Sequence, residues 1–187
     1  MELRRTKREI LYRGRVVDLV VDEIQYPSGK TGLREIVRHP GGSVVVPLFE
    51  DGTVLLVQQL RYPLGEEILE LPAGKLAPGE DPREAAGREL EEETGYRAAH
   101  LAKLSSIYTS PGFCDEELHI YLATGLARSA GGPRREEGEA SMTMQSVTLS
   151  EALAMIGRGE IRDGKTIVGL LLTVNRLRAE GRGEIPG

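Results

Sequence analysis

The stretch from Gly74 to Tyr96, GKLAPGEDPREAAGRELEEETGY, constrains this 187-residue chain more than any other segment. A glycine opens it, Glu80 follows after five residues, and it ends in the run RELEEETG over residues 88–95. This stretch combines helix boundary signals with closely spaced carboxylates. It therefore predicts a short acidic helix whose position in the chain is fixed at both ends.

The boundaries of that helix can be read from single residues. Asp81 suits the N-cap and Pro82 the first helical position, where its missing N–H costs nothing. Glu84 stands three residues after the cap, as a capping box requires. Gly95 suits the position just past the end, where a positive φ is common. We therefore predict a helix over residues 82–94.

Three carboxylates share one face of this helix. Glu89, Glu92 and Glu93 stand at i, i+3 and i+4, so their side chains are neighbours. A solvated acidic face is the ordinary explanation of such a run. The cap, the leading glycine and the spacing of Glu80 favour a metal site instead, because clustered carboxylates are what Mg²⁺ or Mn²⁺ needs. The opposite face is apolar and is predicted to meet the core through Ala85, Ala86 and Leu90.

Composition excludes several classes of protein. The net charge of −5 disfavours broad nucleic-acid binding, so no nucleic-acid partner is expected. Cys114 is the only cysteine, which rules out an internal disulfide and fits a reducing cytoplasm. The charged N-terminus has no apolar signal core, and the longest apolar stretch, 167–174, is too short to span a bilayer. We expect a cytoplasmic protein without a membrane partner.

Strands dominate the chain ahead of the helix. Valine-rich or alternating segments predict them over residues 15–26, 33–38, 43–49, 53–60 and 67–71. Segments 15–26 and 33–38 form a small antiparallel unit that is too small to stand alone. Because Asp51-Gly52 separates two apolar runs, 43–49 and 53–60 are predicted to pair as a hairpin.

Strands, a long loop and two helices follow the acidic helix. The strands are predicted over 104–108, 117–123 and, more weakly, 142–149. Residues 125–141 form a long polar loop that includes Glu137 and Glu139. Ser150 is predicted to cap a helix over 151–156, and an apolar helix follows over 166–178.

The 74–96 stretch matches in full the signature of the Nudix hydrolases, G-x5-E-x7-R-E-U-x-E-E-x-G-U, where U is a bulky apolar residue. Further segments resemble the ADP-ribose pyrophosphatase branch of that family. They are REIV at 34–37, QLRY at 59–62, ELPAG at 70–74, and Pro111, which lies fifteen residues after Tyr96. The resemblance covers about residues 9–175. It implies an α/β/α sandwich with a mixed sheet, preceded by an N-terminal antiparallel strand region.

The resemblance also implies a domain arrangement and a metal centre. Residues 1–40 would be exchanged in a homodimer, 41–180 would form the catalytic domain, and 181–187 would be a flexible tail. Glu80 would orient Arg88 and support the loop. About two or three Mg²⁺ or Mn²⁺ ions per site would be held by the Ala73 carbonyl, Glu89, Glu92 and Glu93.

The remaining implied residues concern substrate and catalysis. Substrate would be bound by Arg34, Arg61, Pro111, Gly112 and Glu116, with Arg34 acting across the dimer. Glu92 and Arg88 would belong to the catalytic centre. The general base would be Glu139 or Glu137. Residues 141–145, SMTMQ, depart from the family pattern after this loop, and so both candidates stay open.

The implied reaction is metal-dependent hydrolysis of the pyrophosphate bond of a nucleoside diphosphate sugar. ADP-ribose, giving AMP and ribose 5-phosphate, is the first expectation. The alternatives are another nucleotide sugar such as GDP-mannose, or a nucleotide-binding regulator that no longer cleaves. A complete set of glutamates argues against the regulator.

Overall fold

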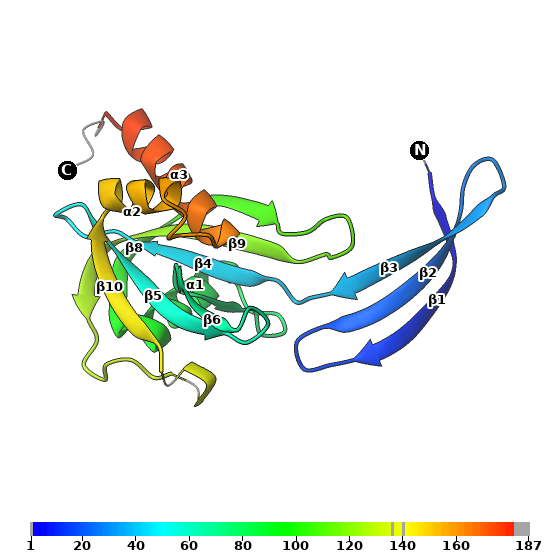
Figure 1. The fold of residues 1–187 in the computed structure, drawn as a ribbon, viewed down its shortest axis with the longest axis horizontal. Coiled ribbons are helices and arrows are strands. Elements are labelled where there is room, and N and C mark those ends of the chain that lie inside the picture. The colour runs from blue at the N-terminus through cyan, green and yellow to red at the C-terminus, as the bar shows by residue number, and fades with distance from the viewer. Residues whose placement is uncertain (1, 136, 140, 182–187) are drawn as a thin grey trace. The chain divides into compact units, whose positions relative to one another are not determined.

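The computed structural model describes residues 2–135, 137–139 and 141–181 (Figure 1). Its chain separates into two compact units, each described here by itself. The first unit contains Met1–Gly41 and Tyr108–Glu117, and the second contains Gly42–Ile107 and Leu118–Gly187. Beyond Gly181, the tail that we expected to be flexible lies outside the described residues.

The first unit is built on an antiparallel sheet of β1 (Arg4–Arg13), β2 (Asp18–Gln25) and β3 (Thr31–Arg38), in that order. Strand β2 alternates as predicted and buries Val20, Asp22 and Ile24 on one face. Arg8 of β1 donates two bonds of 2.6 Å to the Asp22 carboxylate. The sequence did not indicate β1, because its residues are exposed throughout and mostly charged.

A segment distant in sequence completes this unit. The Val37 N–H donates to the Phe113 carbonyl at 2.8 Å, and the Asp115 N–H donates to the Val37 carbonyl at 3.2 Å. The Asp115 carboxylate also accepts from the His39 N–H at 2.9 Å. Residues 108–117, which run from the end of one predicted strand (104–108) to the start of the next (117–123), therefore belong with the N-terminal strands.

The second unit holds two sheets. One is mixed and runs in the order β7 (Ala73–Lys75), β4 (Gly42–Pro47), β9 (Glu117–Arg128), β8 (Tyr96–Tyr108). The other is antiparallel and runs β10 (Thr143–Thr148), β5 (Thr53–Arg61), β6 (Glu66–Glu70). The remaining elements are α1 (Pro82–Thr94), the 3-10 turn η1 (Glu137–Glu139), α2 (Leu149–Gly157) and α3 (Gly164–Ala179).

The predicted hairpin between 43–49 and 53–60 is wrong. The turn exists, with Gly52 at φ 83° and a single bridge between Leu48 and Val54. However, β4 and β5 lie in different sheets, and β4 pairs in parallel with β9 instead. The continuous valine run of β4 is fully buried on both faces, as is typical of a parallel strand inside a layered fold.

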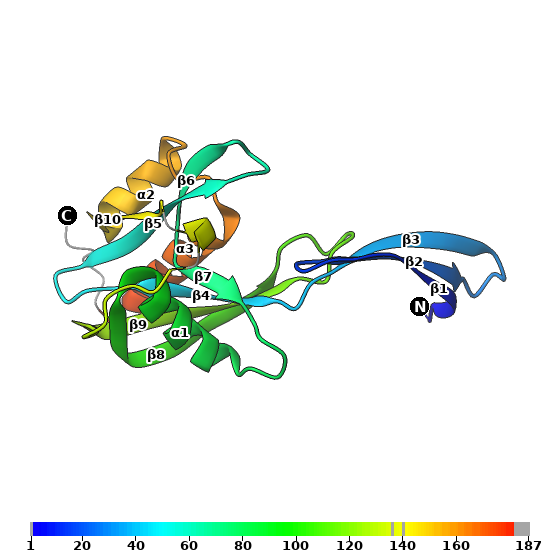
Figure 2. The ribbon, with the colours of Figure 1, turned by 90° about the horizontal axis from the view of Figure 1, so that it is seen from below.

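Helices cover both faces of the mixed sheet, which confirms the predicted layered α/β fold (Figure 2). Helix α1 packs on one face through Ala86 and Leu90, against Val45 and Tyr121. The opposite face carries the larger core, which includes residues of β5, α2 and α3. The site below is therefore carried by a helix packed on a buried sheet.

Helices α2 and α3 both begin two residues earlier than predicted. Thr148, not Ser150, caps α2 by accepting from the Glu151 N–H at 3.1 Å. Asp163 caps α3 by accepting from the Thr166 N–H at 3.0 Å. Among the described residues, no helix is both long and apolar enough to cross a membrane.

Candidate metal and hydrolase site

Helix α1 begins and ends where the sequence predicts. The Asp81 carboxylate accepts from the backbone N–H groups of Arg83 and Glu84, at 2.8 and 3.3 Å. Gly95 has φ 71° and donates its N–H to the Glu91 carbonyl at 2.8 Å. Ala85, Ala86 and Leu90 are fully buried, as predicted, and Glu89 and Glu93 on the acidic face are buried as well.

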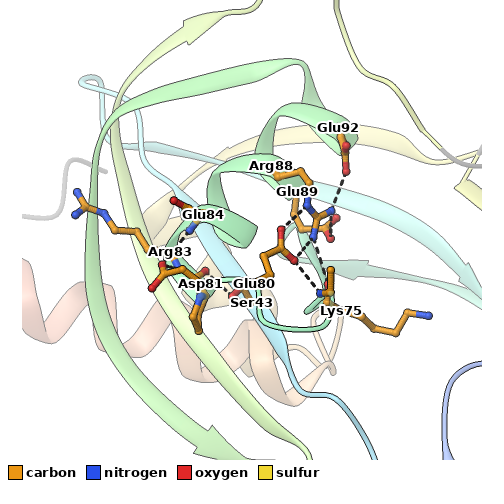
Figure 3. A network of polar contacts seen from close by, with 11 residues as sticks. Ser43, Lys75, Glu80, Asp81, Arg83, Glu84, Arg88, Glu89 and Glu92 are labelled. Atoms are coloured by element: carbon orange, nitrogen blue, oxygen red, sulfur yellow. Dashed lines mark hydrogen bonds and ion pairs between the residues drawn. The ribbon is translucent and has the colours of Figure 1, made fainter.

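Arg88 organises the carboxylates around the start of this face (Figure 3). Its guanidinium donates to both oxygens of Glu80, at 2.8 and 3.0 Å, as the resemblance implied. It also donates to Glu89 at 2.7 Å, to Glu92 at 3.0 Å and to the Lys75 carbonyl at 3.3 Å. The bond from Arg88 holds the pKa of Glu80 below its usual value. One arginine thus joins the loop after β7 to the helix.

Glu93 is the most buried carboxylate of the helix, at 2% exposure, and Glu89 follows at 8%. Glu93 accepts a bond from the Ala73 backbone, but its Oε2 atom is buried with no hydrogen-bond partner among the described residues. Burial, then the charges of Glu139 and Glu89, raise the pKa of Glu93 to about 8. Burial also raises the pKa of Glu89. The Glu93 carboxylate therefore needs a cation nearby to be stable in its charged form.

These residues fit a hard divalent cation. Their donors are oxygens alone, as Mg²⁺ and Mn²⁺ prefer. Gly74 leaves the space that Glu89 occupies, since a Cβ added there would lie 2.0 Å from the Glu89 carboxylate carbon. Within the described residues, no group of three or more histidine, cysteine, aspartate or glutamate side chains is already arranged to hold a metal ion. Arg88 holds Glu89 and Glu92, so Glu93 is the best available anchor.

Glu137 and Glu139, the two candidate general bases in the loop between β9 and β10, differ in their surroundings. Both lie in η1, where Glu137 is exposed and Glu139 is half-buried. The charge of Glu139 raises the pKa values of Glu89 and Glu93, so its carboxylate lies within electrostatic reach of both. The Met142 N–H donates to the Glu139 carbonyl at 2.9 Å and fixes the end of this turn.

Sequence reasoning missed a second polar network beside the helix. Arg61 donates two bonds of 2.5 Å to Glu70, which is only 1% exposed. Lys165 binds Glu70 as well, and binds Asp163 at 2.9 Å. The charge of Lys165 lowers the pKa of Glu93, against the larger effects that raise it. The usable signal was Glu70, a glutamate at the end of a predicted buried strand, which requires cationic partners.

The structure divides the predicted substrate residues between the units. Arg61 lies in the second unit with α1, and the first unit contains Arg34, Pro111, Gly112 and Glu116. Arg34 donates to the Tyr26 hydroxyl at 2.6 Å. Glu116 accepts from the Thr109 hydroxyl at 2.7 Å and pairs with His39 at 3.2 Å.

Comparison with known proteins gives consistent matches. Residues 38–167 match the model of the NUDIX domain. The chain is 45% identical over 164 residues to a methanol dehydrogenase activator of Bacillus methanolicus, covering 88% of each protein. It is 43% identical over 166 residues to an ADP-ribose pyrophosphatase of Bacillus subtilis (strain 168), covering 89% of each. In fold, it is similar to the crystal structure of an ADP compounds hydrolase, with a TM-score of 0.85, 19% identity and 97% of each chain covered.

Proposed function

This chain belongs to the NUDIX domain family, and on that premise we propose that it hydrolyses the pyrophosphate bond of a nucleoside diphosphate sugar. ADP-ribose is the proposed first substrate, with AMP and ribose 5-phosphate as products. The ADP-ribose pyrophosphatase of Bacillus subtilis, similar over most of the chain, supports this choice. The proposed setting is the cytoplasm.

One observation carries the chemistry. Two buried carboxylates, Glu89 and Glu93, lie side by side on a fixed helix, and one Glu93 oxygen has no partner among the described residues. Such a pair is unfavourable without a cation. A divalent ion, Mg²⁺ or Mn²⁺, would be held there by Glu93 and Glu89 with Glu92 and the Ala73 carbonyl. When bound, it would neutralise phosphate charge and acidify a bound water.

Residues of the protein itself would position the metal ligands and take the proton from water. Glu80 fixes Arg88, and Arg88 in turn holds Glu89 and Glu92 in place before a substrate arrives. Glu139 would take the proton of the attacking water on its carboxylate. Its electrostatic coupling to Glu89 and Glu93 supports this assignment over the exposed Glu137.

Substrate binding is proposed to involve two copies of the chain. Arg61, Arg34 and Glu116 stay the proposed substrate-binding residues, with Arg34 acting across the dimer. We propose a homodimer in which residues 9–40 cross to the partner. The exposed apolar side chains Ile10, Leu11 and Tyr12 on β1 support an interface on that strand. Light scattering at micromolar concentration tests this proposal, and a monomeric mass would refute it.

A substrate panel tests the function. Purified protein is incubated with ADP-ribose, GDP-mannose and other nucleotide sugars with Mg²⁺ or Mn²⁺, and products are separated by chromatography. An EDTA arm and the Glu93→Gln variant serve as controls. We expect AMP and ribose 5-phosphate from ADP-ribose only with metal and native Glu93. Binding of all sugars without cleavage of any would support the non-catalytic regulator instead.

A further inference from the structure

Arg135 lies in the loop between β9 and β10, beside the C-terminal end of α1. Its Nε donates to the main-chain carbonyl of Glu93 at 2.9 Å, and its Nη1 donates to the carbonyl of Met142. The same residue, Glu93, thus offers its side chain to the proposed metal and its carbonyl to Arg135.

The end of α1 needs such a partner. The last carbonyls of a helix have no intrahelical donor and carry partial negative charge. The last turn of α1 contains no basic residue of its own. The loop supplies donors instead: the Arg134 N–H donates to the Glu92 carbonyl at 2.7 Å, and the Ser129 N–H donates to the Gly95 carbonyl at 2.8 Å. Arg135 adds the only formal positive charge that bonds directly to these carbonyls in the described residues.

The other end of the bridge leads to Glu139. Met142 is 2% exposed, and its N–H donates to the Glu139 carbonyl at 2.9 Å. Strand β10 begins at the next residue and pairs with β5. Arg135 therefore ties the helix that carries Glu93 to the buried residue that fixes the backbone of Glu139.

We propose that Arg135 is a positioning residue that sets the separation between the Glu139 carboxylate and the metal-binding carboxylates of α1. This inference rests on the proposed function, in which Glu139 acts on water beside the metal. Arg135 touches no reacting atom, so its effect passes through Glu139. Loss of the bridge should therefore lower kcat and leave KM nearly unchanged.

Arg134 provides a matched control. It lies in the same loop and carries the same charge, but its side chain is 64% exposed and only approaches Glu91, at 3.9 Å. Its link to α1 runs through the backbone N–H, which Arg134→Ala keeps. We expect Arg135→Ala to lower kcat roughly 10- to 100-fold, the size of losing a residue that orients a catalytic group, and Arg134→Ala to change it less than about 2-fold.

A double mutant separates positioning from general stability. If Arg135 acts through Glu139, adding Arg135→Ala to Glu139→Gln should lower kcat no further than Glu139→Gln does alone. Arg135→Lys keeps the charge but lacks the fork that reaches two carbonyls, so it should recover only part of the loss. A fully additive double mutant, or a wild-type rate for Arg135→Lys, would refute the two-carbonyl bridge.

Hydrogen exchange tests the bridge without any reaction. The Met142 amide, which bonds Glu139, should be protected in the wild type and in Arg134→Ala, and should exchange faster in Arg135→Ala. Equal protection in the two alanine variants would overturn the proposal. If the wild type cleaved no nucleotide sugar, the proposed function would fail, whereas the exchange result would still decide whether Arg135 holds this loop.

Discussion

Without metal, the buried Glu93 carboxylate should lower the free energy of unfolding, and Glu93→Gln should remove this destabilisation. The pKa of Glu93 is raised to about 8, whereas an unfolded glutamate titrates near 4.3. A carboxyl group whose folded pKa is raised destabilises the fold above its unfolded pKa. The cost therefore grows from about pH 4.3 and levels off above about pH 8. At about 1.4 kcal/mol per unit, it is roughly 4 kcal/mol at pH 7.5 and about 1 kcal/mol at pH 5.

Thermal unfolding in EDTA measures this difference. For a chain of this size, 1 kcal/mol moves Tm by about 2–4 °C. Structural relaxation reduces the full value, so we expect Glu93→Gln to melt roughly 4–10 °C above wild type at pH 7.5. The difference in Tm between Glu93→Gln and wild type should fall at pH 5 to about a quarter of its value at pH 7.5. Glutamine keeps a carbonyl oxygen for the Ala73 backbone bond, so that contact survives.

Glu91 offers the matched control on the same helix. Arg97 binds its carboxylate at 2.8 Å, and that bond lowers the pKa of Glu91. Glu91→Gln should therefore leave Tm unchanged or lower it, the opposite sign to Glu93→Gln. Added Mg²⁺ should raise the Tm of wild type more than that of Glu93→Gln, because the metal binds the folded state. A Glu93→Gln protein that melts below wild type in EDTA at pH 7.5 would refute the reasoning.

Three further outcomes are expected. Glu139→Gln should lower kcat about 10²-fold with substrate binding little changed, and Glu137→Gln should do less; near-native rates in both would move the base elsewhere. Gly169→Ala places a Cβ 2.6 Å from Leu71 in the core and should cost roughly 1–2 kcal/mol of unfolding free energy, measured in urea. Asp22, whose pKa its arginine partner lowers, stabilises the first unit above about pH 3.9. Pepsin cleavage of that unit should increase as pH falls below this value, and Asp22→Asn should remove the dependence.

The sequence predicted best the features whose signals are local. Helix α1 has the predicted bounds because Asp81, Pro82 and Gly95 act within one turn of the ends they define. Strand β1 was missed for the opposite reason. Its pattern shows no apolar alternation, since no residue of β1 is buried in this unit. Strand β4 was given the wrong partner because a turn signal at Gly52 says nothing about sheet membership.

The same distinction applies to the site. The carboxylate face of α1 follows from helical spacing, so Glu89 and Glu93 could be named in advance. The partners that hold the surroundings are distant in sequence. Lys165 reaches Glu70 across 95 residues, and Arg135 reaches the Glu93 carbonyl across 42. No spacing rule connects such pairs, because only the folded chain brings them together.

The parallel pairing of β4 with β9 has a consequence for synthesis of the chain. Strand β4 precedes α1 in sequence and β9 follows it, yet α1 buries Ala86 and Leu90 against both. A 13-residue helix is marginal in water by itself, and closing a long loop is entropically unfavourable. A nascent chain that ends before Leu118 therefore holds every glutamate of α1 but lacks Tyr121 and Ala123, the β9 residues of the cluster in which that helix packs. Metal capture should begin only after β9 has left the ribosome.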